Sequence, residues 1–207
     1  MKKTFIVGPI GGGIAEVSSV LCFAERGESS RPTFPAEWKD NILIKYITVD
    51  GSHGGIEESR YLMNNNGSHT FAEHNKLIAE AINEHATASH IFLLGTGLSL
   101  FVKNFIEEYP DATVYFVKRQ DNNEDLKQII AHSEIEEMCE CGAYHIPATE
   151  DFQQYINSIN DRIKASLDYQ LEKLGLKWTS VPTNDLEKFL IDNVPFMAPT
   201  LISVYKP

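Results

Sequence analysis

Short apolar runs alternate along the chain with longer segments in which apolar residues recur every three to four positions. The runs predict β-strands over residues 4–7, 42–49, 90–94, 113–117, 143–146 and 201–205. The periodic segments predict helices over residues 14–24, 71–85, 98–108, 124–140, 151–174 and 184–191. Strands that alternate with helices are typical of a mostly parallel sheet with helices on both faces. The pattern therefore predicts an α/β fold with one long helix near its C-terminal end.

A glycine-rich turn follows the first predicted strand and opens the first predicted helix. It reads GPIGGGIA over residues 8–15. The backbone N–H groups of such a turn, together with the partial positive charge of a helix N-terminus, favour a bound anion such as a phosphate. We therefore expect the main chain of Gly11, Gly12 and Gly13 to hold a phosphate group. The alternative is a tight turn without a ligand.

The side chains around this turn depart from both well-known phosphate motifs. The spacing of Gly8 and Gly13 fits a Walker A loop, but Ile14 and Ala15 stand where its lysine and hydroxyl residue would be. The dinucleotide fingerprint fails as well, because Glu16 takes the place of its third glycine. A phosphate at this turn would have to be held by the main chain and the helix dipole.

Further polar or glycine-rich loops follow the other predicted strands. The carboxyl ends of parallel strands meet at one edge of a sheet, where ligands bind. The sequence therefore predicts one crevice that gathers several loops, at residues 11–13, 50–55, 64–68, 95–99 and 118–124.

Composition narrows the class of partner and the compartment. The chain has 207 residues and a net charge of −11, which argues against nucleic acid or an anionic membrane as its main partner. Its cysteines form neither a disulfide framework nor a zinc ligand set. No signal peptide or membrane span is evident, so we expect a cytoplasmic protein.

The order of these parts resembles the tubulin/FtsZ superfamily, and most closely its divergent phage tubulin-like members. The first glycine loop, residues 11–15, corresponds to the opening loop of the family. Residues 93–99, LLGTGLS, are similar to its glycine-rich signature, and residues 145–148, HIPA, lead into a long helix like the family's central helix. The resemblance implies a Rossmann-like nucleotide-binding domain over residues 1–174. Residues 175–207 would supply a catalytic-loop-like segment and a last strand, without the usual second domain.

The resemblance also implies roles for particular residues around a bound GTP or GDP, with Mg²⁺ as a candidate companion ion. Thr96 would donate a hydrogen bond to phosphate, and Asp185 would orient the attacking water on the nucleotide of a neighbouring subunit. The remaining contacts would come from Gly95, Gly97 and Ser99 in the second glycine turn, Asn66, Gly67 and Ser68 at the terminal phosphate, Glu124 at the ribose, and Asn160 and Asp161 at the guanine edge. Plain structural roles are the alternatives, such as a helix cap for Asp185 and a first-turn acid for Glu124.

Three functions remain open at this point. The first is a guanine-nucleotide-binding protein that self-associates into filaments and hydrolyses GTP weakly or in trans. The second is a P-loop-derived nucleotide kinase relative with a degenerate Walker A loop. The third is a non-catalytic interaction domain that keeps the fold.

Overall fold

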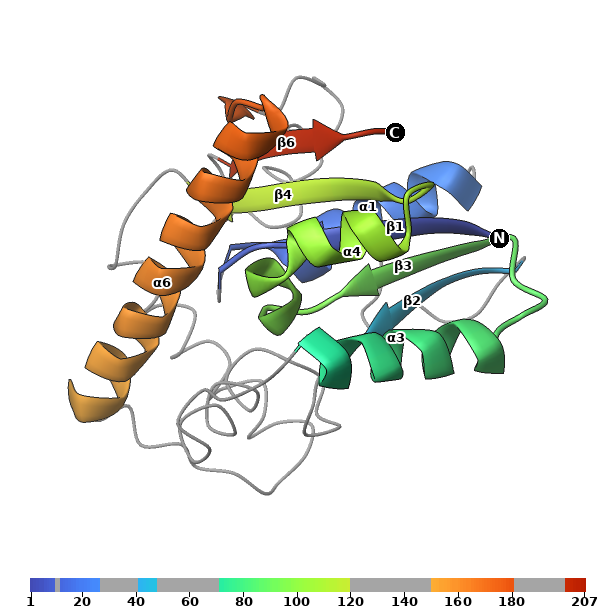
Figure 1. Cartoon of the computed structure of the whole chain (residues 1–207), viewed down its shortest axis with the longest axis horizontal. Helices are drawn as coiled ribbons and strands as arrows, with labels where there is room; N and C mark the ends of the chain where they lie inside the picture. The colour runs from blue at the N-terminus through green and yellow to red at the C-terminus, as the bar shows by residue number, and fades with distance from the viewer. Residues whose placement is uncertain (10–11, 27–40, 48–70, 120–149, 181–199) are drawn as a thin grey trace.

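The strands of this computed structural model, which describes residues 1–9, 12–26, 41–47, 71–119, 150–180 and 200–207, form one mixed sheet (Figure 1). Within these residues the sheet has six strands in the order β2-β3-β1-β4-β6-β5. The strands are β1 (Lys2–Val7), β2 (Ile42–Tyr46), β3 (His90–Leu94), β4 (Thr113–Arg119), β5 (Thr179–Ser180) and β6 (Thr200–Tyr205). The first four are mutually parallel, whereas β6 runs antiparallel to both β4 and β5.

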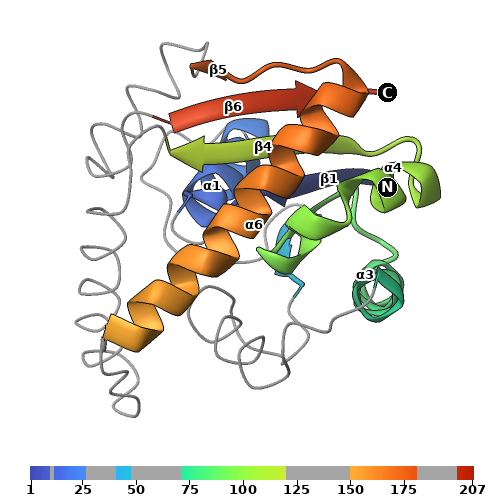
Figure 2. The same cartoon turned by 60° about the vertical axis from the view of Figure 1, so that its left-hand side comes forward.

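Helices cover both faces of the sheet (Figures 1 and 2). One face carries α1 (Ile14–Arg26). The other carries α3 (Phe71–Glu84), the 3-10 turn η1 (Gly97–Leu100), α4 (Val102–Glu108) and the long α6 (Glu150–Leu174). The mostly parallel α/β architecture predicted from the hydrophobic pattern is thereby confirmed.

Side-chain alternation divides the apolar residues of the central strands between two cores. In β1, Phe5 and Val7 belong to the larger core beneath α3, α4 and α6, whereas Ile6 belongs to the smaller core beneath α1. A strand buried on both faces reads as a continuous apolar run, which is why β1 and β3 stand out in the sequence. The helix α6 contributes a stripe with a four-residue spacing, made of Ile159, Ile163, Leu167 and Leu171.

Aromatic rings fill the larger core where α4 crosses the sheet. The rings of Phe5 and Phe105 stack with centroids 5.2 Å apart and planes 9° apart. Phe71 of α3 contacts the same Phe105 ring at 5.3 Å. Phe105 is 1% exposed, and its ring packs α4 against both α3 and the central strand β1.

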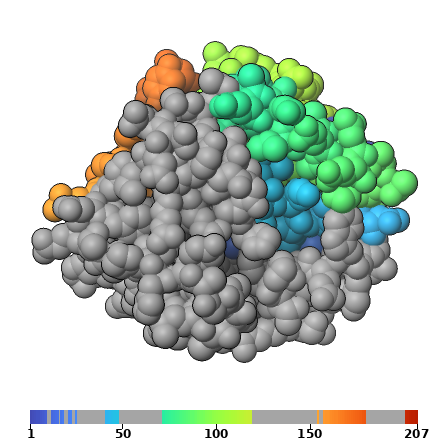
Figure 3. Space-filling view, turned by 90° about the horizontal axis from the view of Figure 1, so that it is seen from below, coloured from blue at the N-terminus to red at the C-terminus, as the bar shows by residue number. Residues whose placement is uncertain are grey.

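The edge strand β2 is tied to the helix beside it. The Nζ atom of Lys45 lies 3.5 Å from Oε2 of Glu84 at the end of α3. In the space-filling view β2 and α3 lie side by side at the surface (Figure 3). Both partners are substantially exposed, so this ion pair adds little to stability.

Several predicted boundaries agree with the structure and some do not. The strand 90–94 is observed as predicted, and the helix predicted over 151–174 is observed as Glu150–Leu174. The helix predicted over 98–108 is instead two pieces, η1 and α4, because Phe101 lies between them with non-helical backbone angles. The strand β5 was not predicted. The elements predicted over 124–140, 143–146 and 184–191 lie outside the described residues.

Among the described strands, the order differs from that of the Rossmann fold that the resemblance implies, although the mostly parallel α/β class holds. β3 lies between β1 and β2, whereas the doubly wound dinucleotide-binding fold has the order 3-2-1-4.

β6 pairs with β4 across six residue positions, from Val114↔Tyr205 to Arg119↔Thr200. The last strand is therefore part of the same sheet as β1.

Candidate functional site

The two glycine turns meet at the carboxyl edge of the sheet. β1 pairs in parallel with β3, with Ile6 opposite Leu94, so the residues after each strand are neighbours. The Ser99 hydroxyl accepts a hydrogen bond from the Gly8 N–H at 2.9 Å and donates one to the Gly8 carbonyl at 3.0 Å. The turns that follow β1 and β3 therefore lie side by side, as expected for parallel strands, whereas most of the other loops of the predicted crevice, over 50–55, 64–68 and 120–124, lie outside the described residues.

This edge is a topological switch point. The chain leaves β1 through α1 on one face and leaves β3 through η1 and α4 on the other. In open α/β sheets, ligands bind outside the carboxyl ends of adjacent strands whose connections part in this way. The position of the glycine turns thus coincides with the usual ligand position of the architecture.

A glycine follows each of β1 and β3, at a position where neighbouring main chain comes too close for a side chain. A Cβ atom on Gly8 would lie 2.3 Å from the Val117 carbonyl oxygen of β4. A Cβ atom on Gly95 would lie 2.5 Å from the carbonyl oxygen of Ile47, directly after β2. Because Gly8 and Gly95 have no side chains, the ends of four strands can approach one another at this edge.

The first turn positions the N-terminus of α1. The Gly12 N–H donates to the Pro9 carbonyl at 2.9 Å, and Gly13 has a φ of 92°, a value that favours glycine. The Gly13 carbonyl then accepts from the Val17 N–H at 3.0 Å, which starts the helix. The N–H groups of residues 14–16 therefore precede the first intrahelical donor, as at any helix N-terminus.

Exposure differs along this turn. Gly12 and Gly13 are buried, whereas Ile14 and Ala15 are partly exposed. The side chains of Ile14 and Ala15 pack against the core beneath α1. The accessible part of the turn is therefore the first turn of the helix, and only its main chain can bind an anion.

The second turn is buried and supports the first. All residues from Gly95 to Ser99 are buried, and Thr96 is 2% exposed. The Thr96 side chain makes no capping hydrogen bond to η1. Contacts from Gly95, Thr96, Gly97 or Ser99 to a phosphate stay predictions, while the observed role of Ser99 is to hold Gly8.

Gln170 of α6 clamps the same region. Its Nε2 donates to the Ser99 carbonyl at 2.9 Å, and its Oε1 accepts from the Lys103 N–H at 3.0 Å. Gln170 is 7% exposed, so these bonds are shielded from water. This clamp was not predicted, since a lone glutamine on a helix has no recognisable pattern in the sequence.

Removing the Ser99 hydroxyl is expected to destabilise the protein. Ser99→Ala leaves the buried N–H of Gly8 without its acceptor, which costs about 1–3 kcal/mol. Ser89→Ala is the matched control, because Ser89 makes one exposed hydrogen bond to the Asn41 carbonyl. Urea unfolding followed by circular dichroism compares the two variants. Equal stability of both would show that Ser99 does not hold the turn.

Lys118, near the carboxyl end of β4, is already paired. The Nζ atom of Lys118 lies 3.3 Å from Oδ1 of Asp168 and 4.4 Å from the centroid of the Trp178 ring. Trp178 donates its own Nε1–H to the same carboxylate oxygen at 2.6 Å. Lys118 is thus anchored to α6 and to the segment that follows it.

The other predicted site residues fall into two groups. Gly11, Asn66, Gly67, Ser68, Glu124 and Asp185 lie outside the described residues. Asn160 and Asp161 lie in the first half of α6, which crosses the carboxyl edge of the sheet (Figure 1). Asn160 is 6% exposed and Asp161 is exposed, so the two side chains face different surroundings.

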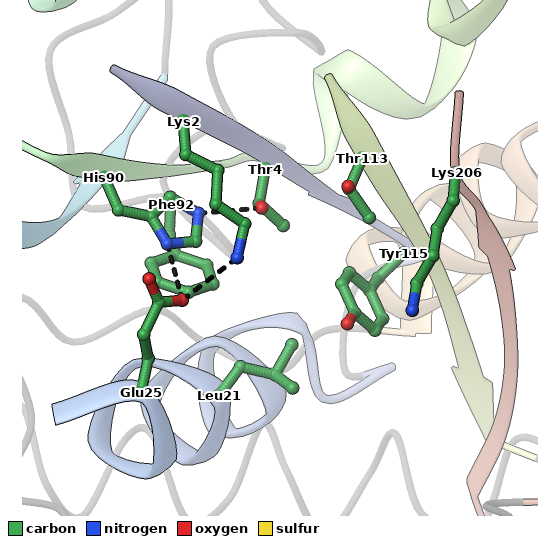
Figure 4. A pocket seen from close by; sticks show the side chains of 9 residues that line it. All are labelled: Lys2, Thr4, Leu21, Glu25, His90, Phe92, Thr113, Tyr115 and Lys206. Carbon is green, nitrogen blue, oxygen red and sulfur yellow. Dashed lines mark hydrogen bonds and ion pairs between the residues drawn. The ribbon is translucent and has the colours of Figure 1, made fainter. Parts of the chain in front are cut away.

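A polar cluster that the sequence analysis missed lies at the opposite edge, at the amino ends of the strands (Figure 4). His90 of β3 is the centre, with its Nε2 2.8 Å from Oγ1 of Thr4 and its Nδ1 2.6 Å from Oε2 of Glu25. Lys2 reaches the same Glu25 oxygen at 3.3 Å. In the sequence, this cluster is marked by a threonine and a histidine that stand in two otherwise apolar strands.

Burial sets the ionisation of this cluster. It lowers the pKa of His90 below 6.5, with Lys2 acting in the same direction and Glu25 opposing. Burial alone would raise the pKa of Glu25, but His90 and Lys2 together outweigh it and lower this pKa below 4.5. Both pKa shifts favour a neutral His90 beside an ionised Glu25 near neutral pH.

The cluster predicts that acid destabilises the protein. Because the pKa of His90 is lower in the folded state, its contribution is fully present above about pH 6.5 and is lost as the pH falls toward the folded value. Glu25 adds a loss of the same sign below pH 4.5. His90→Gln should flatten the rise in unfolding free energy between pH 5 and 7 more than His85→Gln, whose side chain is 16% rather than 2% exposed. An unchanged slope in His90→Gln would contradict this assignment.

In the described part of the chain, no three His, Cys, Asp or Glu side chains gather as a metal site. None of its helices combines the length and apolar content needed to cross a membrane. Comparisons of the chain with protein-family models, curated proteins and solved structures gave no match in any of the three.

Proposed function

We propose that this protein binds a nucleotide through its phosphates at the first turn of α1, at the edge between β1 and β3. The observation that carries the proposal is the Ser99 hydroxyl, which joins the two glycine turns at the topological switch point. Gly8 is held in place before a ligand arrives, so the N-terminus of α1 needs little rearrangement to receive one.

The electrostatics favour recognition by the main chain. Ile14 and Ala15 pack against the core, and Lys118 is engaged by Asp168 and Trp178. The unsatisfied N–H groups and the dipole of a helix N-terminus attract an anion without a cationic side chain. A divalent cation such as Mg²⁺ carried by the nucleotide would offset repulsion from a chain of net charge −11.

Calorimetric titration of the full chain with GDP, GTP and ATP tests this proposal. Gly13→Ala should weaken binding at least about tenfold, because alanine does not readily adopt a φ of 92° and the N–H groups of α1 would shift. Gly175→Ala is the matched control, since Gly175 has a φ of 69° but follows α6. Absence of saturable binding by all three nucleotides would overturn the proposal.

The resemblance to the tubulin/FtsZ superfamily extends the proposal to guanine specificity, filament formation and slow GTP hydrolysis involving Asp185. Sedimentation with GTP or GDP tests this extension, and GTP-dependent pelleting is the expected result. Preference for ATP without pelleting would favour the P-loop-derived alternative. Both outcomes leave the position of the phosphate site unchanged.

A further inference from the structure

A cavity of about 270 Å³ lies at the amino ends of β1, β3 and β4, beneath the last turn of α1. Figure 4 shows the hydrogen-bonded group of Thr4, His90 and Glu25 on one side of it and Tyr115 with Lys206 on the other. The side chains of Leu21 and Phe92 complete its wall. This cavity is separate from the glycine turns, which lie at the other edge of the sheet.

An ionised Glu25 beside a neutral His90 determines which atom donates in each of the two hydrogen bonds. An ionised Glu25 carboxylate can only accept, so the Nδ1 atom of His90, 2.6 Å away, carries the proton of that bond. A neutral imidazole then has a lone pair on Nε2, which lies 2.8 Å from Oγ1 of Thr4. The Thr4 hydroxyl is therefore the donor, and its oxygen is positioned to lose a proton to His90.

This arrangement matches the general signature of an activated nucleophile. A hydroxyl lies within hydrogen-bond reach of a base, and a third group orients that base. The side chain of His90 is 2% exposed and that of Glu25 is 33% exposed, so water reaches the acid more readily than the base. The lowered pKa of His90 keeps the imidazole unprotonated near neutral pH, as a general base requires.

We propose that Thr4, His90 and Glu25 form a nucleophilic relay that hydrolyses a small activated ester. The Thr4 oxygen attacks the carbonyl carbon while its proton moves to Nε2 of His90. The bond from that carbon to the leaving oxygen then breaks, and His90 returns the proton to the departing alcohol. Water attacks the resulting ester of Thr4 in the same way, which releases the acid and restores the threonine hydroxyl.

The cavity defines the substrate class. Its volume of about 270 Å³ lies near the lower end for small-molecule sites, so the acyl group is small. Leu21 and Phe92 supply an apolar wall, and Lys206 and Lys2 supply positive charge. Lys2 is paired with Glu25. Lys206 is therefore the lining cation that would stabilise a negative charge on the substrate. A short acyl ester that carries a negative charge fits this lining.

Hydrolysis of p-nitrophenyl esters and labelling by a fluorophosphonate, both on the full chain, test the relay. We expect an initial burst of p-nitrophenol and a covalent adduct that mass spectrometry locates on Thr4. His90→Gln should lower the hydrolysis rate by about 100-fold or more. Thr113→Val is the matched control, because Thr113 lines the same cavity without belonging to the hydrogen-bonded relay.

Thr4→Val should abolish the adduct, whereas Thr4→Ser should keep it and leave the fold intact even where the valine variant does not fold. An adduct on another residue, or none on the wild-type protein, would overturn the relay. A purely structural cluster would change the unfolding midpoint in Thr4→Val without any labelling of the wild-type chain. Nucleotide titration of the same variants separates this result from the proposal at the glycine turns.

Discussion

Replacing Phe105 by alanine is expected to lower the free energy of unfolding by about 3–5 kcal/mol. The ring is 1% exposed and stacks on Phe5 of the central strand at 5.2 Å. It also contacts Phe71 of α3 at 5.3 Å, so the cavity left by alanine would open between three elements. Guanidinium unfolding followed by tryptophan fluorescence measures the loss.

Lys103→Ala on the same helix is the control, because its exposed side chain should change the unfolding free energy by less than about 0.5 kcal/mol. Phe105→Leu should lose less than the alanine variant, since it leaves a smaller cavity. A loss of under 1 kcal/mol in Phe105→Ala would show that α4 is not packed on β1 as described.

Gly8→Ala is expected to cost about 3 kcal/mol, at the upper end for overpacking, and to weaken nucleotide binding. The added methyl group would lie 2.3 Å from the Val117 carbonyl oxygen and 2.9 Å from Cγ2 of Ile14. The Val117 carbonyl belongs to the main chain of β4 in the middle of the sheet, so it cannot rotate away from the added methyl group. Relief would have to come from movement of the turn that positions α1.

Gly175→Ala provides the comparison for this variant. A Cβ at Gly175 meets nothing within 4 Å, so its cost arises from the φ of 69° alone, about 1–2 kcal/mol. Thermal unfolding and calorimetric titration of both variants separate crowding from backbone strain. Equal stability and equal affinity in the two variants would contradict the crowded edge.

The hydrophobic pattern predicted the central strands because they are buried on both faces. β3 is apolar from Ile91 to Leu94 and is followed by Gly95, where the Ile47 carbonyl directly after β2 leaves no room for a side chain. The break between η1 and α4 was missed, since the apolar spacing continues through Phe101 while the backbone does not. The antiparallel direction of β6 depends on the return path of the chain, which periodicity does not encode.

Some residues of the candidate sites could be predicted from the sequence, and others could not. Gly13 and Gly95 could be found because glycine marks positive φ or close main-chain approach within a short segment. The bonds of Ser99 to Gly8 and of His90 to Thr4 span 91 and 86 residues, and they depend on the register of β1 against β3. Such pairs become visible only once the strands are aligned.

The most direct test of the nucleotide site is an amide NMR titration of the ¹⁵N-labelled full chain with GDP and Mg²⁺. Ligand phosphates at the start of α1 should shift the signals of Gly13, Ile14 and Ala15 while the Gly175 signal stays in place. Amide signals of the first helical turn that remain unmoved at millimolar GDP, GTP and ATP would contradict the account.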